Sequence, residues 1–441
     1  MRLIWILLLV LGGSLTGYLI TRFERGDPQI QTRRSPVYVG SEYVHPLSVY
    51  DEGTGLESVR IWIQQGDKVV DLLSETYPGN LFTGADSKSQ VGMEVRLDPK
   101  KQGLEDGQAT LHFEARDYSW LGNRSNVAVP LMIDTRAPLI SLQTGLTYVR
   151  RGGAEAVVYQ LNEASVKHGV EVGELFFPGY EHPSAPGRQV AFYVVPADMD
   201  PGLRPQVFAS DRAGNRSIAR IPIEIIERNF PSDRIELSLA FMEKKVNELM
   251  SGANGDVLAT YLKINNEMRR ANAKQIHELC QRSSSDRLWS GEFRQLPNSH
   301  VGARFADQRT YVFEGRNVDS QVHQGYDLAS TSNAPVLAAN DGVVIFADPL
   351  GIYGNTVILD HGLGLFSLYG HLSGFAVEKG EAVSKGNVLG KTGTTGLAGG
   401  DHLHFAMLVS GVFVDPLEWF DPRWIREHIE PKLSYAALDK H

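Results

Sequence analysis

The sequence is poor in cysteine. Only one of its 441 residues, Cys280, is a cysteine, which excludes a disulfide framework and any cysteine-rich zinc module. The excess of acidic over basic residues is also modest, with 43 Lys and Arg against 52 Asp and Glu and a net charge of −9. This balance excludes a strongly basic nucleic-acid-binding protein as a description of the whole chain, so no nucleic-acid partner is expected. The apolar fraction of 42% and the charged fraction of 22% are typical of a globular protein, and the length predicts about three domains.

Charge is absent from residues 3–20 (LIWILLLVLGGSLTGYLI), an apolar run close to the ~20 residues that cross a bilayer. No convincing small-residue cleavage site follows it between Gly17 and Ile30. We therefore favour an uncleaved, single-pass signal anchor over residues 1–25 and retain a cleaved signal peptide as the alternative. Arginines flank both ends of the run, so the positive-inside rule does not fix its orientation.

Helical periodicity is nearly absent from residues 33–227, which are rich in β-branched and aromatic runs bounded by Gly, Pro, Asp and Asn. Two segments in this region resemble each other. In each copy an aspartate, Asp117 or Asp211, is followed by Gly-Asn-Arg-Ser and then, five residues after the serine, by a proline. Asp and Gly-Asn favour turns, so each copy predicts a hairpin near the end of a domain.

The spacing of the two copies is close to the ~100 residues of an immunoglobulin-like sandwich. We therefore expect two tandem immunoglobulin-like domains, at residues 33–135 and 136–227. One interpretation makes them modules that bind a ligand or an envelope protein partner. The favoured interpretation makes them spacers that hold a downstream domain away from the membrane.

A helical connector is predicted for residues 228–295. An apolar stripe at helical spacing begins at Ile235, continues through Leu239 to Leu249, and has Ser232 as its expected N-cap. A second helix is expected from about Asp256 to Gln281. Its His277-Glu278 pair is not followed by the second histidine of an H-E-x-x-H zinc motif, so His277 is interpreted as a surface residue. From its position, the connector is also a candidate for limiting access to the region that follows.

Histidines at informative spacing lie in the C-terminal part of the chain. His323 and Asp327 stand four residues apart, and His402 and His404 belong to an apolar run, HLHFAMLV, that predicts a strand. Residues i and i+2 of a strand point to the same face, so both imidazoles can enter one site. His371 ends another apolar run, LFSLYGHL.

These residue types suit a catalytic zinc site, which needs three protein ligands of the His, Asp or Glu type and one open position for water. The metal then makes a water molecule nucleophilic at neutral pH. Four groups are available in the H-x-x-x-D and H-x-H pairs, and His371 is a fifth. Since no glutamate of the H-E-x-x-H kind is present, histidines must move the proton, as their pKa allows.

The segment from about 300 to 420 resembles the lysostaphin/LytM-type zinc metallopeptidases, which are peptidoglycan endopeptidases. The resemblance is carried in order by HQGYD, by the strand from Ala334, by the Asp341-Gly-Val-Val and GNTVILDHG segments, and by YGHL and HLHF. It implies zinc ligands at His323, Asp327 and His404. It also implies that His371 and His402 are catalytic residues that do not bind the metal.

The resemblance implies a zinc peptidase domain at residues 296–425 that hydrolyses stem or cross-link peptides of peptidoglycan. Because peptidoglycan lies outside the cytoplasmic membrane, the N-terminus is expected inside and the catalytic domain on the periplasmic or extracytoplasmic side. The alternatives are a non-catalytic regulator of other cell-wall hydrolases and a cell-envelope scaffold. The predicted fold class is mainly β, with an N-terminal transmembrane helix, two immunoglobulin-like sandwiches, the helical connector and an antiparallel-β peptidase domain.

Overall fold

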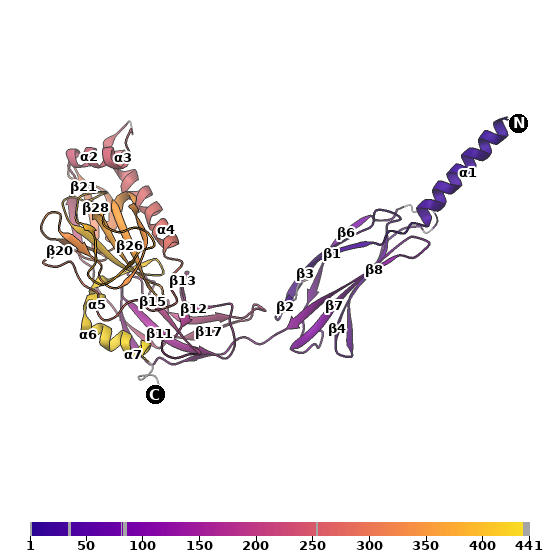
Figure 1. Cartoon of the computed structure of the whole chain (residues 1–441), viewed down its shortest axis with the longest axis horizontal. Coiled ribbons are helices and arrows are strands. Elements are labelled where there is room, and N and C mark those ends of the chain that lie inside the picture. The colour runs from indigo at the N-terminus through magenta and orange to yellow at the C-terminus, as the bar shows by residue number, and fades with distance from the viewer. Residues whose placement is uncertain (1, 34–36, 81, 83–85, 253–254, 435–441) are drawn as a thin grey trace. The chain divides into compact units, whose positions relative to one another are not determined.

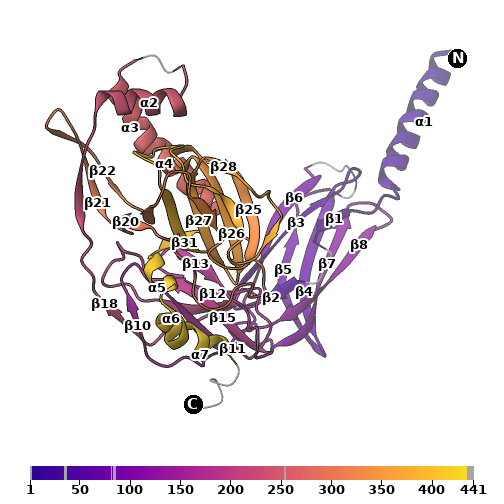
Figure 2. The same ribbon diagram turned by 60° about the vertical axis from the view of Figure 1, so that its left-hand side comes forward.

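The computed structural model describes residues 2–33, 37–80, 82, 86–252 and 255–434. The chain forms two compact units. The first contains residues 1–138 together with 210–216, and the second contains residues 139–209 together with 217–441. Figure 1 shows the order of the elements along the chain, and Figure 2 shows the same elements from a second side.

The N-terminal apolar run forms helix α1 (Arg2–Arg22). Its segment Ile4–Arg22 has a mean hydropathy of 1.9, and none of the most apolar window is buried inside the protein. This length and composition suit either a membrane anchor or a signal sequence, as the sequence predicts.

Among the described residues of the first unit, eight strands follow α1 and enclose one core. They form a three-stranded sheet, β1-β3-β6, and a five-stranded sheet, β2-β8-β7-β4-β5. Alternate residues of β4 and β7, such as Ile61 and Phe113, are buried between the sheets, which explains the period-two pattern of the sequence. The strands are β1 (Gln29–Thr32), β2 (Val37–Val39), β3 (Tyr43–Tyr50), β4 (Leu56–Gln65), β5 (Lys68–Thr76), β6 (Gln90–Leu97), β7 (Gly107–Asp117) and β8 (Arg124–Ile133).

The two Gly-Asn copies are turns, as predicted. The side-chain amide of Asn123 donates to Asp117 Oδ2 at 2.8 Å, and Asn215 donates to Asp211 Oδ2 at the same distance. Each asparagine thus closes its turn on the aspartate that begins it. The immunoglobulin-like classification and the domain boundaries remain predictions.

The second unit begins with two further four-stranded sheets, ordered β14-β15-β11-β9 and β13-β12-β16-β17, and a parallel pair, β10-β18. Between residues 23 and 238 the described residues contain no helix, in agreement with the missing helical periodicity. The strands are β9 (Ile140–Leu142), β10 (Thr147–Arg150), β11 (Ala154–Leu161), β12 (Lys167–Val172), β13 (Leu175–Pro178), β14 (Tyr180–Glu181), β15 (Arg188–Val194), β16 (Gln206–Ser210), β17 (Arg216–Arg220) and β18 (Ile223–Ile226).

The first helix of the connector begins later in the sequence than the apolar periodicity predicts. Residues 232–236 form strand β19 (Ser232–Glu236), which pairs in parallel with β21 (Gln308–Phe313). The helix α2 (Leu239–Leu249) then begins after Ser238, whose side chain caps the amide of Phe241. The prediction of Ser232 as the N-cap was therefore wrong, because pairing with a strand more than seventy residues away outweighs the local helical pattern.

The second predicted helix is present. It begins after the N-cap Asp256 as α3 (Val257–Lys263), passes through a π-helical turn (Ile264–Met268) and continues as α4 (Arg269–Leu279). His277 is exposed, as expected, and Cys280 is buried at the end of α4.

The C-terminal sheet is antiparallel throughout, as predicted, with the order β20-β23-β31-β27-β26-β25-β29 and with β32 added beside β31. Every residue of β27 and β31 is buried, because both faces of the sheet are covered. Phe366, Ala406 and Leu408 pack with the connector helices, whereas Tyr369 and Phe405 face the core that includes β11 and β15.

These strands are β20 (His300–Ala303), β23 (Tyr326–Ala329), β25 (Gly342–Pro349), β26 (Asn355–Gly362), β27 (Leu365–Leu372), β29 (Ala382–Val383), β31 (Leu403–Val409) and β32 (Val412–Val414). Two small sheets flank them. One continues β19-β21 with β22 (Arg316–Val322), and the other joins β24 (Pro335–Leu337), β30 (Val388–Lys391) and β28 (Gly374–Phe375).

The tail after the sheet consists of short helical turns, α5 (Pro416–Phe420), α6 (Pro422–Trp424), a π-helical turn (Ile425–Ile429) and α7 (Glu430–Leu433). The sequence predicts that this tail packs back on the peptidase domain. Trp419 is fully buried against Trp289 and Phe293, but its ring also contacts Phe192 of β15. The tail therefore joins the C-terminal sheet to the β sheets that precede the connector within the second unit.

Candidate metal centre

Three of the predicted site residues meet at the centre of the C-terminal sheet. His323 follows β22, Asp327 lies in β23, and His404 lies directly opposite Asp327 in β31. The Nε2 atom of His323 and the Nδ1 atom of His404 each lie 2.9 Å from Oδ1 of Asp327 and 3.2 Å from one another. Strand pairing thus brings together residues that are far apart in the sequence.

Neighbouring residues hold the outer atoms of His323 and Asp327 and leave the inner atoms of these two side chains available. His323 Nδ1 donates to the carbonyl oxygen of Arg304 at 2.9 Å, which leaves Nε2 as a lone-pair donor. Asp327 Oδ2 accepts from a guanidinium nitrogen of Arg309 at 2.8 Å, which leaves Oδ1 facing the two imidazoles.

The electrostatics favour neutral imidazole at the centre. Burial lowers the pKa of His404 to about 4, so this ring is neutral near pH 7 and able to bind a metal. Burial by itself raises the pKa of Asp327, but His323, His402 and His404 outweigh it and hold the pKa well below its usual range. Asp327 is therefore an ionised carboxylate.

These three residues fit a metal ion. Their donor atoms all lie within 4.8 Å of one another, and their two nitrogens and one carboxylate oxygen are the donor set of three-ligand zinc sites. Both histidines are almost completely buried while the group faces a pocket, so a further coordination position is open to that side. The chain thus contains a candidate His-Asp-His metal site.

His371 and His402 lie beside this group. Their ring centres are 4.8 Å apart, and the ring of His371 is 5.8 Å from that of His404. The Nδ1 atom of His371 donates to the carbonyl oxygen of Thr395, and Nδ1 of His402 donates to that of Gly400, both at 2.8 Å. In His371 this leaves Nε2 free to accept a proton. Nε2 of His402 lies 3.4 Å from Asp327 Oδ1, and although burial lowers the pKa of this ring, the carboxylate outweighs burial and raises it.

The backbone of His371 is strained. Its φ of 62° lies in the left-handed region, which residues other than glycine seldom occupy, although histidine does so more often than most. The strained residue is also one of the predicted catalytic histidines, in keeping with the clustering of such strain at functional sites. Burial, followed by the charges of His402 and His404, lowers the pKa of His371 well below its usual range, so its ring is neutral.

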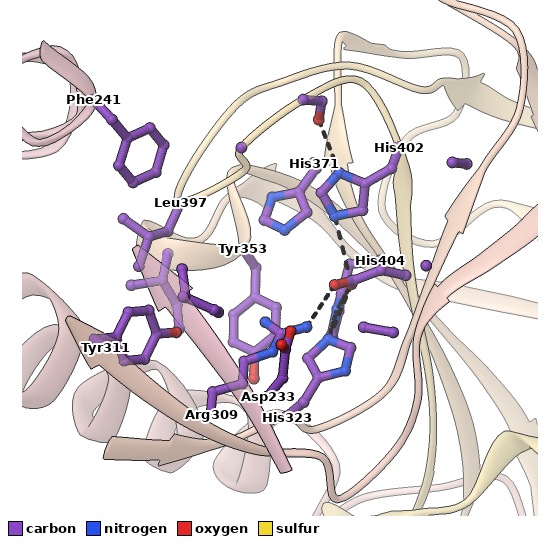
Figure 3. A pocket seen from close by; sticks show the side chains of 18 of the residues that line it. Asp233, Phe241, Arg309, Tyr311, His323, Tyr353, His371, Leu397, His402 and His404 are labelled. Carbon is purple, nitrogen blue, oxygen red and sulfur yellow. Dashed lines mark hydrogen bonds and ion pairs between the residues drawn. The ribbon is translucent and has the colours of Figure 1, made fainter. Parts of the chain in front are cut away.

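The five residues line one pocket of about 450 Å³. Figure 3 shows the histidines on one side of it and the aromatic rings of Phe241 and Tyr311 on the other. The connector supplies part of the wall through residues of β19, α2 and α3, namely Ile235, Phe241 and Tyr261. The Gly-rich segment that contains Gly399 and Gly400 lines the rim of this pocket.

The sequence did not identify two residues that support the site. Arg309 holds Asp327 from strand β21, and Lys245 of α2 is buried against the Gly-rich rim through a bond to the carbonyl oxygen of Thr394. The only local signal for Arg309 is its i, i+2 relation to Tyr311 in an apolar strand, which places both side chains on one face.

Other histidines and aromatics near the site have structural roles. His361 is completely buried, with Nδ1 bonded to the carbonyl oxygen of Asp341 and Nε2 to Ser367, so it is not part of the metal group. Tyr369 is buried too, and its hydroxyl accepts from the amide of Ala339. Asp401, next to His402, accepts from the amide of Asn333 and so fixes the start of β31.

Comparison with known proteins identifies the region that carries this site. Residues 321–416 match the model of peptidase family M23. The DD-carboxypeptidase/endopeptidase Mpg of Neisseria meningitidis is 40% identical over 97 residues, which are 22% of this chain and 22% of that protein. The peptidoglycan DD-endopeptidase ShyA of Vibrio cholerae is 29% identical over 157 residues, 36% of this chain and 34% of its own length.

Among solved structures, a putative peptidase M23 from Pseudomonas aeruginosa is similar with 21% identity and a TM-score of 0.40, over 61% of this chain and 94% of that one. The curated relatives are thus matched over about a third of their length or less.

Proposed function

We propose that this chain, whose C-terminal domain belongs to peptidase family M23, is a membrane-anchored zinc endopeptidase that hydrolyses peptide cross-links of peptidoglycan. The observation that carries the proposal is the convergence of His323, Asp327 and His404 with His371 and His402 in one pocket of that domain. The names of the relatives Mpg and ShyA favour a bond between two D-configured residues over a glycine bridge.

His323 Nε2, Asp327 Oδ1 and His404 Nδ1 would hold the zinc ion. When bound, zinc polarises the substrate carbonyl and lowers the pKa of a water molecule so that it attacks at neutral pH. Arg309 keeps the Asp327 carboxylate oriented, and the Arg304 carbonyl keeps the proton of His323 on Nδ1. The protein thereby presents three ligand atoms close together at the pocket.

His371 and His402 handle the protons. Because a carbonyl oxygen holds the Nδ1 proton of each ring, each Nε2 can accept a proton from the attacking water and pass it to the leaving amine. A protonated Nε2 is also a hydrogen-bond donor to the oxygen on which negative charge develops. Which ring acts as base and which as electrostatic partner follows from the substrate pose.

The anchoring is supported by α1, whose 19-residue apolar segment has the length of a membrane span. Since peptidoglycan lies outside the cytoplasmic membrane, the N-terminus lies inside and the chain beyond α1 lies on the extracytoplasmic side. The β sheets that precede the connector then act as spacers between the membrane and the peptidase domain.

The test uses the full chain in detergent or nanodiscs, incubated with purified peptidoglycan, with fragments identified by mass. We expect chelator-sensitive release of uncross-linked stem peptides, restored by zinc. His404→Ala should lose both zinc and hydrolysis, whereas His371→Ala should keep zinc and lose hydrolysis by roughly 10²–10⁴-fold. His277→Ala, at an exposed position of α4, is the matched control and should be fully active.

Hydrolysis that persists in both His404→Ala and excess chelator would overturn the proposal. Zinc binding by the wild-type chain without hydrolysis would instead favour the regulator of other wall hydrolases. Fragments cut within a glycine bridge would show that the proposed bond is wrong, but they would not contradict the proposed metal site.

A further inference from the structure

A group of apolar side chains surrounds the end of α1 in the first unit. Trp120, in the turn between β7 and β8, donates its backbone amide to the carbonyl oxygen of Arg22 at 2.8 Å. Its ring makes edge contacts with Tyr18, Phe23 and Phe82, with ring centres 5.9, 5.1 and 6.4 Å away. We call these four residues and the adjacent Leu121 the aromatic collar.

The collar joins three separate segments of the chain. Tyr18 and Phe23 belong to the end of α1, Phe82 to the segment between β5 and β6, and Trp120 and Leu121 to the turn before β8. The hydroxyl of Tyr18 donates to the carbonyl oxygen of Phe82 at 2.6 Å, which ties the second segment to the helix. The helix is thus bonded to two turns of the first β region (residues 29–133).

The collar packs around one tryptophan but leaves much apolar surface in solvent. The exposed fractions are 64% for Phe82, 52% for Leu121, 48% for Phe23 and 37% for Tyr18. Single exposed apolar residues are ordinary, whereas a contiguous group of large ones marks a surface that contacts a partner or a membrane.

We propose that the aromatic collar lies in the outer interface of the lipid bilayer and seats the first β region directly on the membrane surface. This inference rests on the proposed retention of α1 as an anchor. The apolar segment Ile4–Arg22 has 19 residues, so it is about 28 Å long at ~1.5 Å per residue. That length matches a hydrocarbon core of about 30 Å, so Phe23 lies at the level of the lipid headgroups and Tyr18 lies about one helical turn below that level.

Lipid is the favoured occupant because the collar is continuous with the surface of α1, none of whose most apolar window is buried inside the protein. Tryptophan and tyrosine prefer the headgroup level, where the ring is in an apolar medium and the N–H or O–H group stays hydrated. Arg25, which is exposed just after α1, carries a charge that suits the same level. If a second copy of the chain or another protein covered the collar instead, the collar would not need to lie at any particular depth in the bilayer.

The experiment places one thiol at a time on the surface of the full chain in proteoliposomes. The only native cysteine, Cys280, is buried, so Phe82→Cys and Leu121→Cys can be labelled selectively with an environment-sensitive fluorophore. Val69→Cys is the matched control, because Val69 is 51% exposed and apolar but lies opposite Gln64 at the far end of β4. Asp117, which lies just before the turn that carries the collar, pairs with Leu56 at the near end of β4. From Leu56 to Gln64 the strand extends about 26 Å, so the control position lies about that far from the collar along β4.

The liposomes carry lipids with a nitroxide near the headgroup end of the acyl chain. We expect quenching at positions 82 and 121 to be at least about twofold stronger than at position 69, because quenching requires the same depth in the bilayer. Equal quenching at all three positions, with the chain still resistant to carbonate extraction, would contradict the membrane location of the collar. It would leave the anchoring by α1 unchallenged. Release of the chain by carbonate, or a mature mass that lacks α1, would overturn both.

A blue-shifted label at positions 82 and 121 that responds to protein density but not to nitroxide lipid would point to a protein partner and overturn the lipid assignment. Peptidoglycan hydrolysis is measured separately on the same samples. Its loss would therefore not be mistaken for a change at the membrane.

Discussion

The ammonium group of Lys245 in α2 lies 2.8 Å from the backbone carbonyl oxygen of Thr394, on the Gly-rich rim of the metal centre. The same buried ammonium pairs with Glu248 at 2.9 Å, and Glu248 in turn accepts from the amide of Gly396. Between these two contacts lies Thr395, whose carbonyl oxygen accepts from Nδ1 of His371. The connector helix therefore holds the segment that orients a predicted catalytic histidine.

Lys245→Met should lower kcat about tenfold through His371 while KM and zinc content stay near the wild-type values. The reason is positional, since methionine fills the space but leaves the Thr394 carbonyl and Glu248 without their shared donor. Steady-state kinetics on a soluble cross-linked peptide and metal analysis provide the measurement. Lys244→Met, one residue away and exposed, is the control. Failure of Lys245→Arg to recover any activity, or equal losses in both methionine variants, would argue against positioning.

Arg309→Met should weaken zinc binding about 10- to 100-fold, because Asp327 Oδ2 loses the guanidinium that fixes the carboxylate. Competition with a chelator of known affinity measures the change, and hydrolysis at saturating zinc should be largely recovered. Arg316→Met, an exposed position on the neighbouring strand β22, should bind zinc as the wild type does. An unchanged zinc affinity in Arg309→Met would show that Asp327 needs no support from β21.

Glu418 should make stability fall as pH rises from about 5 to about 8. Burial, helped by the charge of Asp415, raises the pKa of this carboxyl to about 8, above its value in the unfolded chain. The folded state therefore binds a proton that the unfolded state has released, and the resulting stability is lost as pH passes the folded-state pKa. At ~1.4 kcal/mol per pKa unit the change is on the order of 4 kcal/mol.

The measurement is the midpoint of thermal unfolding between pH 5 and pH 9 for the wild type and for Glu418→Gln. The variant should flatten the decline, because an amide does not titrate. Glu427→Gln, on the half-exposed surface of the same tail, should keep the wild-type slope. Identical slopes in all three proteins would mean that Glu418 is ionised throughout.

Patterns within short windows of the sequence predicted the main helices and strands of this molecule. The apolar run of α1, the period-two strands, and the alternation of His402 and His404 are all visible in short windows, because the geometry of helix and strand depends on neighbours a few residues apart. The spacing of His323 and Asp327 likewise predicted their association with the H-x-H strand. The structure brings these residues and His371 into one pocket, as the motif predicts.

Tertiary structure decided what no short window contains. Residues 232–236 include the start of the predicted helical stripe yet form β19, since hydrogen bonding to residues 308–312 satisfies their backbone. Arg309 and Lys245 reach the site only because strand β21 and helix α2 fold against it. Trp419 is buried against Phe192 and Trp289, which the sequence places in different domains. The sequence by itself determined which residues are candidates for the chemistry, because the motif is local, whereas long-range pairing and burial decided which side chains hold them in place.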